Sequence, residues 1–301
     1  SPAWSIAGDR PSAYLGEYAG GGDINGDGFD DVVVLEVDRI RVFKGSATGP
    51  DATPSWTILA PSEYGIFVGF RSNRLAIQDL DGDGFADLAN TSVESRGNSF
   101  VGRLFVYRGS ALGPELARLI DLDYSKGHRL ATAFSAGDVN ADGRDDLILT
   151  FFSGFYNPEP GLDEPETVLI FEGSRSVLRP IGRVLLDGIP SDALQHTGSA
   201  GDINNDGYGD LIVAESFNPL DGNSYHRVQL FTGGRHGLGD TPAAIIVPGQ
   251  PGDLAPFWAS TGRAGDVNGD GYDDVIVGAP FYDGVAYNSG RVYVIHGRAS
   301  F

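Results

Sequence analysis

The stretch GDVNGDGYDDVIVGAP, residues 265–280, places four aspartates within nine positions, directly before an apolar run. At neutral pH these carboxylates repel one another. Val275, Ile276 and Val277 have the β-branched, apolar character of a buried strand. So much negative charge beside a buried strand indicates that something positive is held among the acids.

The acidic motif is repeated along the chain. Five copies begin at Asp23, Asp79, Asp138, Asp202 and Asp266. Successive copies are therefore separated by 56, 59, 64 and 64 residues. Each copy is followed by a strand-like segment that ends at a glycine, such as RVQLFTG at 227–233. A further short apolar segment follows, such as SWTILA at 55–60, and no unit shows a helical stripe. Such regular self-similarity predicts a repeat architecture.

Each repeat reads as four short antiparallel strands, which is the composition of a propeller blade. We therefore expect an all-β, five-bladed β-propeller of four-stranded antiparallel blades, forming a single domain over residues 1–301. PAWSIAG at 2–8 resembles the outer-strand segment ATPSWTILA at 52–60, and the chain stops after the third strand of its last repeat. This pattern predicts that the N-terminal strand closes the last blade. The alternative is a five-repeat segment of a larger ring.

Composition excludes several classes of function. The chain carries 21 Lys+Arg against 41 Asp+Glu, a net charge of -20, so we expect neither nucleic-acid binding nor attraction to an anionic membrane. It has no cysteine, which excludes disulfides and thiolate zinc sites. No apolar run approaches transmembrane length, so we expect no membrane insertion. The start, Ser1-Pro2-Ala3-Trp4, is not a signal peptide, and we expect a processed chain that lacks its targeting segment.

The residue types within the motif indicate calcium. Positions 1, 3, 5 and 9 always carry side-chain oxygens, position 6 is always glycine, and the backbone carbonyl of position 7 can face the same centre. Calcium takes 6–8 oxygen ligands, whereas magnesium requires stricter geometry and zinc prefers nitrogen or sulfur. We expect about five Ca²⁺ ions, one per blade, in loops 23–31, 79–87, 138–146, 202–210 and 266–274. The predicted ligands are Asp23, Asn25, Asp27, Phe29 and Asp31; Asp79, Asp81, Asp83, Phe85 and Asp87; Asp138, Asn140, Asp142, Arg144 and Asp146; Asp202, Asn204, Asp206, Tyr208 and Asp210; Asp266, Asn268, Asp270, Tyr272 and Asp274.

The motif begins like an EF-hand loop but lacks the glutamate at position 12, and a strand follows it instead of a helix. A solvated acidic turn is the other alternative, and five copies in phase argue against it. The second loop carries four carboxylates where the others carry three and an asparagine, so we predict that it binds calcium most tightly. Asp30, Asp145 and Asp273, at position 8, are expected to point outward. We expect the ions to be structural, each fixing one turn.

The repeat resembles the FG-GAP repeat, the blade unit of the integrin alpha-subunit β-propeller. The closest copy is AGDVNGDGYDDVIVGAP at 264–280, where Val277-Gly278-Ala279-Pro280 carries the GAP half and Phe257-Trp258-Ala259 lies where the FG half falls. The resemblance implies an extracellular or cell-surface, calcium-binding adhesion or ligand-recognition module. It also implies a protein or carbohydrate ligand on the face opposite the calcium loops. The chain departs from the integrin propeller in blade number, because the integrin propeller has seven blades and this chain has five repeats.

Variable loops are the natural places for a ligand on a symmetric scaffold. The connections at 153–166, 215–226 and 281–289 differ most between repeats. We expect ligand contacts at aromatic side chains in or beside them, Tyr156, Phe217, Tyr225, Trp258, Tyr282 and Tyr287, although each could instead pack on a neighbouring blade.

We expect a non-enzymatic, monomeric recognition module. A lectin is the alternative function, because fungal lectins with similar calcium repeats bind sugars. A glycosidase-type enzyme is the weaker alternative, since Asp163, Glu164, Glu166 or Glu215 could supply a pair of carboxylates. The third alternative is a purely structural role as a repeat region of a larger surface protein.

Overall fold

The computed structural model contains β-strands and turns but no helix in the residues that it describes. Accordingly, no part of the described chain forms an apolar helix long enough to cross a membrane. The chain divides into two compact units, Ser1–Phe134 and Ser135–Phe301. The described residues are 4–11, 13–16, 18–36, 38–59, 75–96, 99–122, 128–153, 167–175, 178–185, 194–217, 225–246, 260–280, 282 and 289–301.

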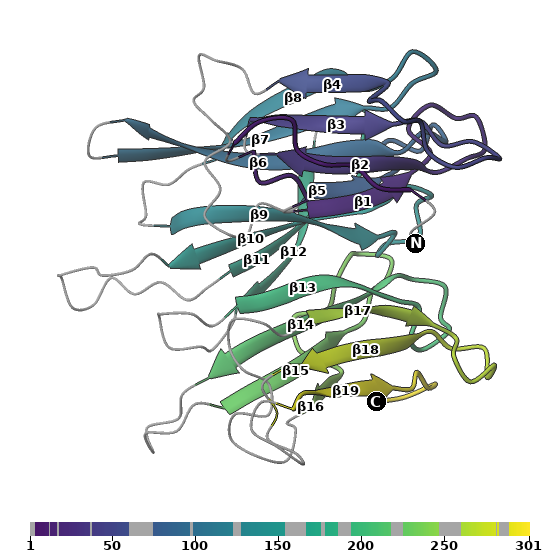
Figure 1. The fold of residues 1–301 in the computed structure, drawn as a ribbon. Helices are drawn as coiled ribbons and strands as arrows, with labels where there is room; N and C mark the ends of the chain where they lie inside the picture. The colour runs from purple at the N-terminus through teal and green to yellow at the C-terminus, as the bar shows by residue number, and fades with distance from the viewer. Residues whose placement is uncertain are drawn as a thin grey trace. The chain divides into compact units, whose positions relative to one another are not determined.

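The first unit contains two four-stranded antiparallel sheets, each with its strands in chain order (Figure 1). Each sheet corresponds to one sequence repeat, with the acidic motif between its first and second strands. The strands are β1 (Tyr18–Gly22), β2 (Asp31–Glu36), β3 (Arg39–Phe43) and β4 (Trp56–Leu59), then β5 (Leu75–Gln78), β6 (Asp87–Arg96), β7 (Ser99–Arg108) and β8 (Glu115–Leu122).

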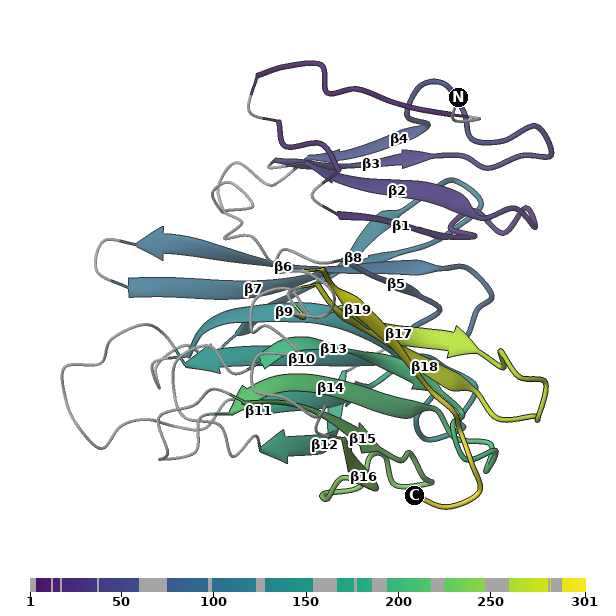
Figure 2. The same ribbon diagram turned by 60° about the horizontal axis from the view of Figure 1, so that its bottom comes forward.

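The second unit contains the other three repeats, two as four-stranded sheets and one as a three-stranded sheet (Figure 2). The boundary between the units falls within β9, which belongs to the sheet of β10–β12. The strands are β9 (His128–Gly137), β10 (Asp146–Ser153), β11 (Thr167–Glu172) and β12 (Arg179–Leu185); β13 (Leu194–Gly201), β14 (Asp210–Phe217), β15 (Tyr225–Phe231) and β16 (Ala244–Ile246); β17 (Ser260–Gly265), β18 (Asp274–Ala279) and β19 (Arg291–Ile295).

These five antiparallel sheets confirm the predicted fold class, because all described structure is β and each repeat forms its own sheet, consistent with a five-bladed propeller. The apolar run after each acidic motif forms the second strand of its sheet. In β14, Leu211, Ile212 and Val213 are all fully buried, although neighbouring side chains of a strand point to opposite faces. Burial on both faces of the strand therefore explains why apolar and polar residues do not alternate along this run.

Neighbouring sheets within each unit share a hydrophobic core. In the first unit, Val33 and Leu35 of β2 pack in one cluster with Leu88 of β6 and Phe105 of β7. In the second, Ile212 of β14 and Leu230 of β15 share a cluster with Val275 and Val277 of β18. Full burial of one such side chain contributes about 1.5–3 kcal/mol relative to exposure. This stacking holds the first-to-second-strand turns of adjacent sheets close together.

The N-terminal segment differs from the prediction that it supplies a closing strand. Its described residues 4–8 form no strand, and the last sheet has three described strands. The Trp4 ring packs edge-on against Phe43 of β3, with centroids 5.2 Å apart, and its Nε1 donates to the carbonyl of Asp51 at 3.1 Å. Trp56 of β4 makes a similar bond, donating to the carbonyl of Leu112 at 3.0 Å. Indole packing and this hydrogen bond therefore hold residue 4 on the first sheet.

Candidate metal centres

All five acidic motifs fold into the same loop, which is held by hydrogen bonds from its own backbone. The Asp23 carboxylate at position 1 accepts the N–H groups of Asp27 at 3.0 Å and Gly28 at 2.8 Å. The equivalent bonds in the other four loops measure 2.8–3.1 Å. The carboxylate at position 5 accepts the N–H of position 7 at 3.0–3.1 Å in every loop. These bonds curl each loop around its own acidic side chains.

Two positions in each loop adopt left-handed backbone conformations. The glycine at position 6 has φ between 83° and 91° in all five loops, as its invariance predicts. Position 4 is also left-handed, with φ from 55° to 75°, and this conformation was not foreseen from the sequence. Glycine occupies position 4 in three loops, while Ala141 and Asn205 occupy it in the third and fourth. Asparagine tolerates this conformation well, but alanine does not, so the shared conformation persists at Ala141 where the residue type does not favour it.

The aspartate at position 9 is a buried clamp between two segments of its repeat. Asp210 is fully buried, and its Oδ2 accepts the N–H of Ile203 at 2.8 Å while its Oδ1 accepts the N–H of Gly233 at 2.8 Å. The same two bonds, at 2.8–3.1 Å, recur at Asp31, Asp87, Asp146 and Asp274. Each clamp joins the start of a loop to the glycine that follows the third strand of the sheet. The sequence indicated only an oxygen ligand here.

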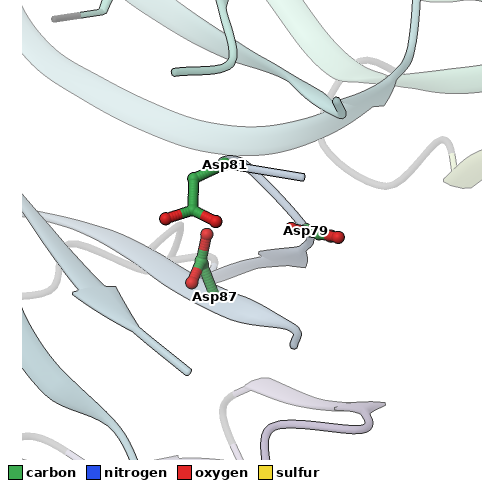
Figure 3. A group of neighbouring side chains, drawn as sticks. All are labelled: Asp79, Asp81 and Asp87. Atoms are coloured by element: carbon green, nitrogen blue, oxygen red, sulfur yellow. The ribbon is translucent and has the colours of Figure 1, made fainter. Parts of the chain in front are cut away.

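The second loop gathers three carboxylates most closely. One oxygen from each of Asp79, Asp81 and Asp87 lies within 4.8 Å of the others. Figure 3 shows the carboxylates of Asp81 and Asp87 turned toward one another, with Asp79 beside them. Asp81 and Asp87 are buried, and Arg108 pairs with Asp81. In the other four loops, asparagine stands at the position of Asp81.

Burial makes ionisation of the clamp carboxylates costly. Desolvation is the main cause that raises the pKa of Asp87, Asp146 and Asp210 to about 7. The neighbouring acids also act to raise it, whereas backbone hydrogen bonds from Gly109, Gly173 and Gly233 act to lower it. Burial likewise raises the pKa of Asp31. Burial also acts to raise the pKa of Asp274, but hydrogen bonds from Gly297, Val267 and His296 outweigh it, so this pKa is lowered. A divalent cation would favour the ionised forms, and the all-oxygen side-chain set at positions 1, 3, 5 and 9 suits calcium.

Position 8 connects successive loops within each unit. The backbone N–H of Ala86 donates to the carbonyl of Asp23 at 2.8 Å, and that of Gly209 donates to Asp138 at 2.7 Å. The N–H of Asp273 donates to the carbonyl of Asp202 at 3.1 Å. In these pairs, the backbone N–H at position 8 of one loop donates to the carbonyl at position 1 of the loop before it. Adjacent loops are therefore joined by a backbone hydrogen bond.

The expectation that Asp273 points outward was wrong. Its Oδ2 accepts the N–H of Asp202 at 2.8 Å, and its Oδ1 pairs with Arg263 at 2.9 Å. The free N–H of the preceding loop attracts this carboxylate, an interaction that sequence spacing cannot reveal. Asp145 also makes an interaction with its surroundings.

In three repeats, the glycine that follows the third strand fits between two backbone carbonyls; these glycines are Gly109, Gly233 and Gly297. A Cβ on Gly233 would overlap the carbonyl oxygen of Gly209 and would lie 2.5 Å from that of Val139. We expect Gly233→Ala to lower the free energy of unfolding by about 2–4 kcal/mol, because neither carbonyl can retreat without breaking the loop contacts.

Chemical denaturation of the purified variants would measure this effect. Gly198→Ala is the matched control, because a Cβ on Gly198 of β13 meets nothing within 4 Å. A Gly233→Ala variant as stable as Gly198→Ala would contradict the close approach.

Most predicted ligand-contact residues cannot be placed. Tyr156, Trp258 and Tyr287 lie outside the described residues. Phe217 ends β14 and Tyr225 begins β15, and the two are paired in register, but their side chains are not described. Tyr282 is half-buried against the core of the second unit, and the Arg291 guanidinium lies 3.5 Å from its ring centroid. The Tyr282 ring therefore has an intramolecular packing role.

The family model described as "FG-GAP repeat" matches residues 196–231 and 257–295, and that described as "FG-GAP-like repeat" matches residues 23–90. These ranges contain four of the five acidic loops, all except the loop at 138–146. The family models thus match the same repeated unit that the loops and sheets define.

Similar curated proteins include integrin alpha chains. "Integrin alpha pat-2" of Caenorhabditis briggsae is 26% identical over 278 residues, 84% of this chain and 22% of that protein. "Integrin alpha-PS2" of Drosophila melanogaster is 28% identical over 243 residues, 73% of this chain and 15% of that protein. The chain thus spans less than a quarter of either relative. Among solved structures, rhamnogalacturonan lyase YesW aligns at a TM-score of 0.47 and 14% identity over 84% of this chain and 49% of that one.

Proposed function

We propose that this chain, whose FG-GAP repeats are similar to those of integrin alpha proteins, is a calcium-binding β-propeller that recognises a protein ligand. The observation that carries the calcium part is the recurrence of one hydrogen-bonded loop in all five repeats. The similarity to integrin alpha chains supports the recognition part, and favours adhesion or ligand recognition over catalysis.

About five ions are proposed, one per loop. In each loop the side chains at positions 1, 3 and 5 would hold the ion with the position 7 carbonyl, as predicted for Asp266, Asn268, Asp270 and Tyr272 in the fifth loop. The position 9 clamp has further lone pairs and would contribute one of them. Bound calcium would supply the positive charge that these carboxylates need. We propose that its role is structural, because each loop joins the first two strands of its sheet.

We propose that the five sheets are the blades of a single propeller domain over residues 1–301, and that it works outside the cell. The ligand would bind on the face opposite the calcium loops. The candidate contact residues are Tyr156, Phe217, Tyr225, Trp258 and Tyr287; Tyr282 is not among them, because its ring packs against Arg291. The strongly acidic composition supports solubility.

The proposed function is tested by probing the full chain against arrays of extracellular proteins and of glycans, in millimolar calcium and in chelator. We expect selective protein binding that chelator abolishes, and weaker binding by Tyr225→Ala. Selective glycan binding without protein binding would replace the proposal with a lectin. Binding to neither array would overturn the recognition role.

A further inference from the structure

One position that varies between the repeats lies beside each acidic loop. It immediately precedes the glycine that follows the third strand, so we name it the pre-glycine position. Its five residues are Lys44, Arg108, Glu172, Thr232 and His296. The glycine that follows donates its N–H to the position 9 clamp in every repeat, at 2.8–2.9 Å. The clamp therefore fixes the backbone of the pre-glycine residue next to the loop.

In the first two repeats the pre-glycine side chain is a cation that occupies the acidic loop. Lys44 Nζ lies 2.9 Å from Asp27 Oδ2 at position 5. Arg108 pairs with Asp81 at position 3, and its Nε lies 3.7 Å from Asp83 Oδ2 at position 5. Lys44 and Arg108 are 45% and 43% exposed, so both can swing out into solvent without disturbing the core.

The other three repeats differ at this position. His296 of the fifth repeat lies near its loop, with Nδ1 3.2 Å from Asp274 Oδ2. Glu172 and Thr232, in the third and fourth repeats, bring no positive charge. Five loops with the same backbone therefore have different charges at their rims.

We propose that Lys44 and Arg108 determine the calcium affinity of the first and second loops, acting as built-in cations that compete with Ca²⁺ for Asp27 and Asp81. This inference rests on the proposed calcium sites. An ion entering either loop must displace the ammonium or guanidinium group from the carboxylates that it needs. The fourth carboxylate of the second loop is thus offset by Arg108, and the five loops fill at different calcium concentrations.

Hydrogen exchange measured by mass spectrometry, as free calcium is raised, tests this loop by loop on the full chain. The calcium concentration at half-protection is read separately from peptides that cover each loop. We expect Arg108→Gln to lower that concentration about fivefold for residues 79–87, at the upper end of what a partly exposed ion pair contributes. The midpoint of the loop at 202–210 should not move, which separates a local effect from a change in net charge.

The reciprocal variant adds a cation where the chain has none. Thr232→Lys should raise the midpoint of the fourth loop about fivefold and leave the second loop unchanged. Thr241→Lys is the matched control, because it adds the same charge at an exposed turn residue and should leave the fourth loop unchanged.

Lys44→Gln provides an independent substitution at the first loop if Arg108→Gln does not fold. Unchanged midpoints in the folded variants, with normal calcium-dependent protection in the parent chain, would overturn the role of the pre-glycine residue alone. A parent chain without calcium-dependent protection in any loop would overturn the proposed calcium sites themselves.

Discussion

Removal of calcium is expected to lower the melting temperature of the protein by about 10 °C or more. A ligand at one hundred times its Kd stabilises a folded protein by about 2.7 kcal/mol per site. An unfolding entropy of about 2.1 cal/mol/K per residue means that one kcal/mol shifts the melting temperature of a 301-residue domain by about 1.6 °C. Three filled loops would therefore account for the shift. Chelation also leaves the repulsion among the carboxylates uncompensated, for example among Asp79, Asp81 and Asp87.

Differential scanning calorimetry in millimolar calcium and in chelator would measure this shift. Magnesium at the same concentration is the control, and it should restore less of the lost stability, because its stricter octahedral geometry suits a flexible oxygen loop less well. Identical melting curves in calcium and in chelator would refute a stabilising role for the ion.

Loss of one clamp carboxylate is expected to be the most damaging point substitution. Asp210→Ala should lower the free energy of unfolding by about 3–5 kcal/mol, because it leaves the N–H groups of Ile203 and Gly233 without their acceptor. Each unsatisfied buried donor costs about 1–3 kcal/mol, and the buried side chain leaves a void.

Denaturant unfolding would quantify the loss at the clamp. Asp240→Ala removes the same charge from an exposed turn residue and should change stability by less than about 0.5 kcal/mol. The measurement repeated in chelator separates the two roles of Asp210, because the backbone clamp operates without metal. A destabilisation that vanishes in chelator would show that Asp210 acts only through calcium.

The features that the sequence predicted correctly are local ones. The glycine required at position 6, such as Gly271, the strand that follows the acidic motif, such as β18, and the β class all follow from spacing within one repeat. These features need only neighbouring residues, so a pattern of residue types is enough to specify them.

The features that the sequence did not reveal depend on backbone groups far along the chain. The clamp at Asp210 depends on the N–H of Gly233, and the contact of Asp273 depends on the N–H of Asp202 in the preceding repeat. Every residue offers such an N–H, so residue type alone does not indicate which one is used. The sequence pattern likewise matched Trp4 to an outer strand. In the structure, Trp4 instead packs against the ring of Phe43, a contact between residues far apart in the sequence.

Calcium bound by the five acidic loops is the central element of the proposed function. Native mass spectrometry of the full chain, titrated with calcium, counts bound ions directly. We predict successive calcium adducts that saturate at about five, matching the five loops, with fewer adducts when Asp202→Ala removes the position 1 carboxylate of the fourth loop. A chain that binds no calcium at millimolar calcium concentrations would contradict the proposed calcium sites.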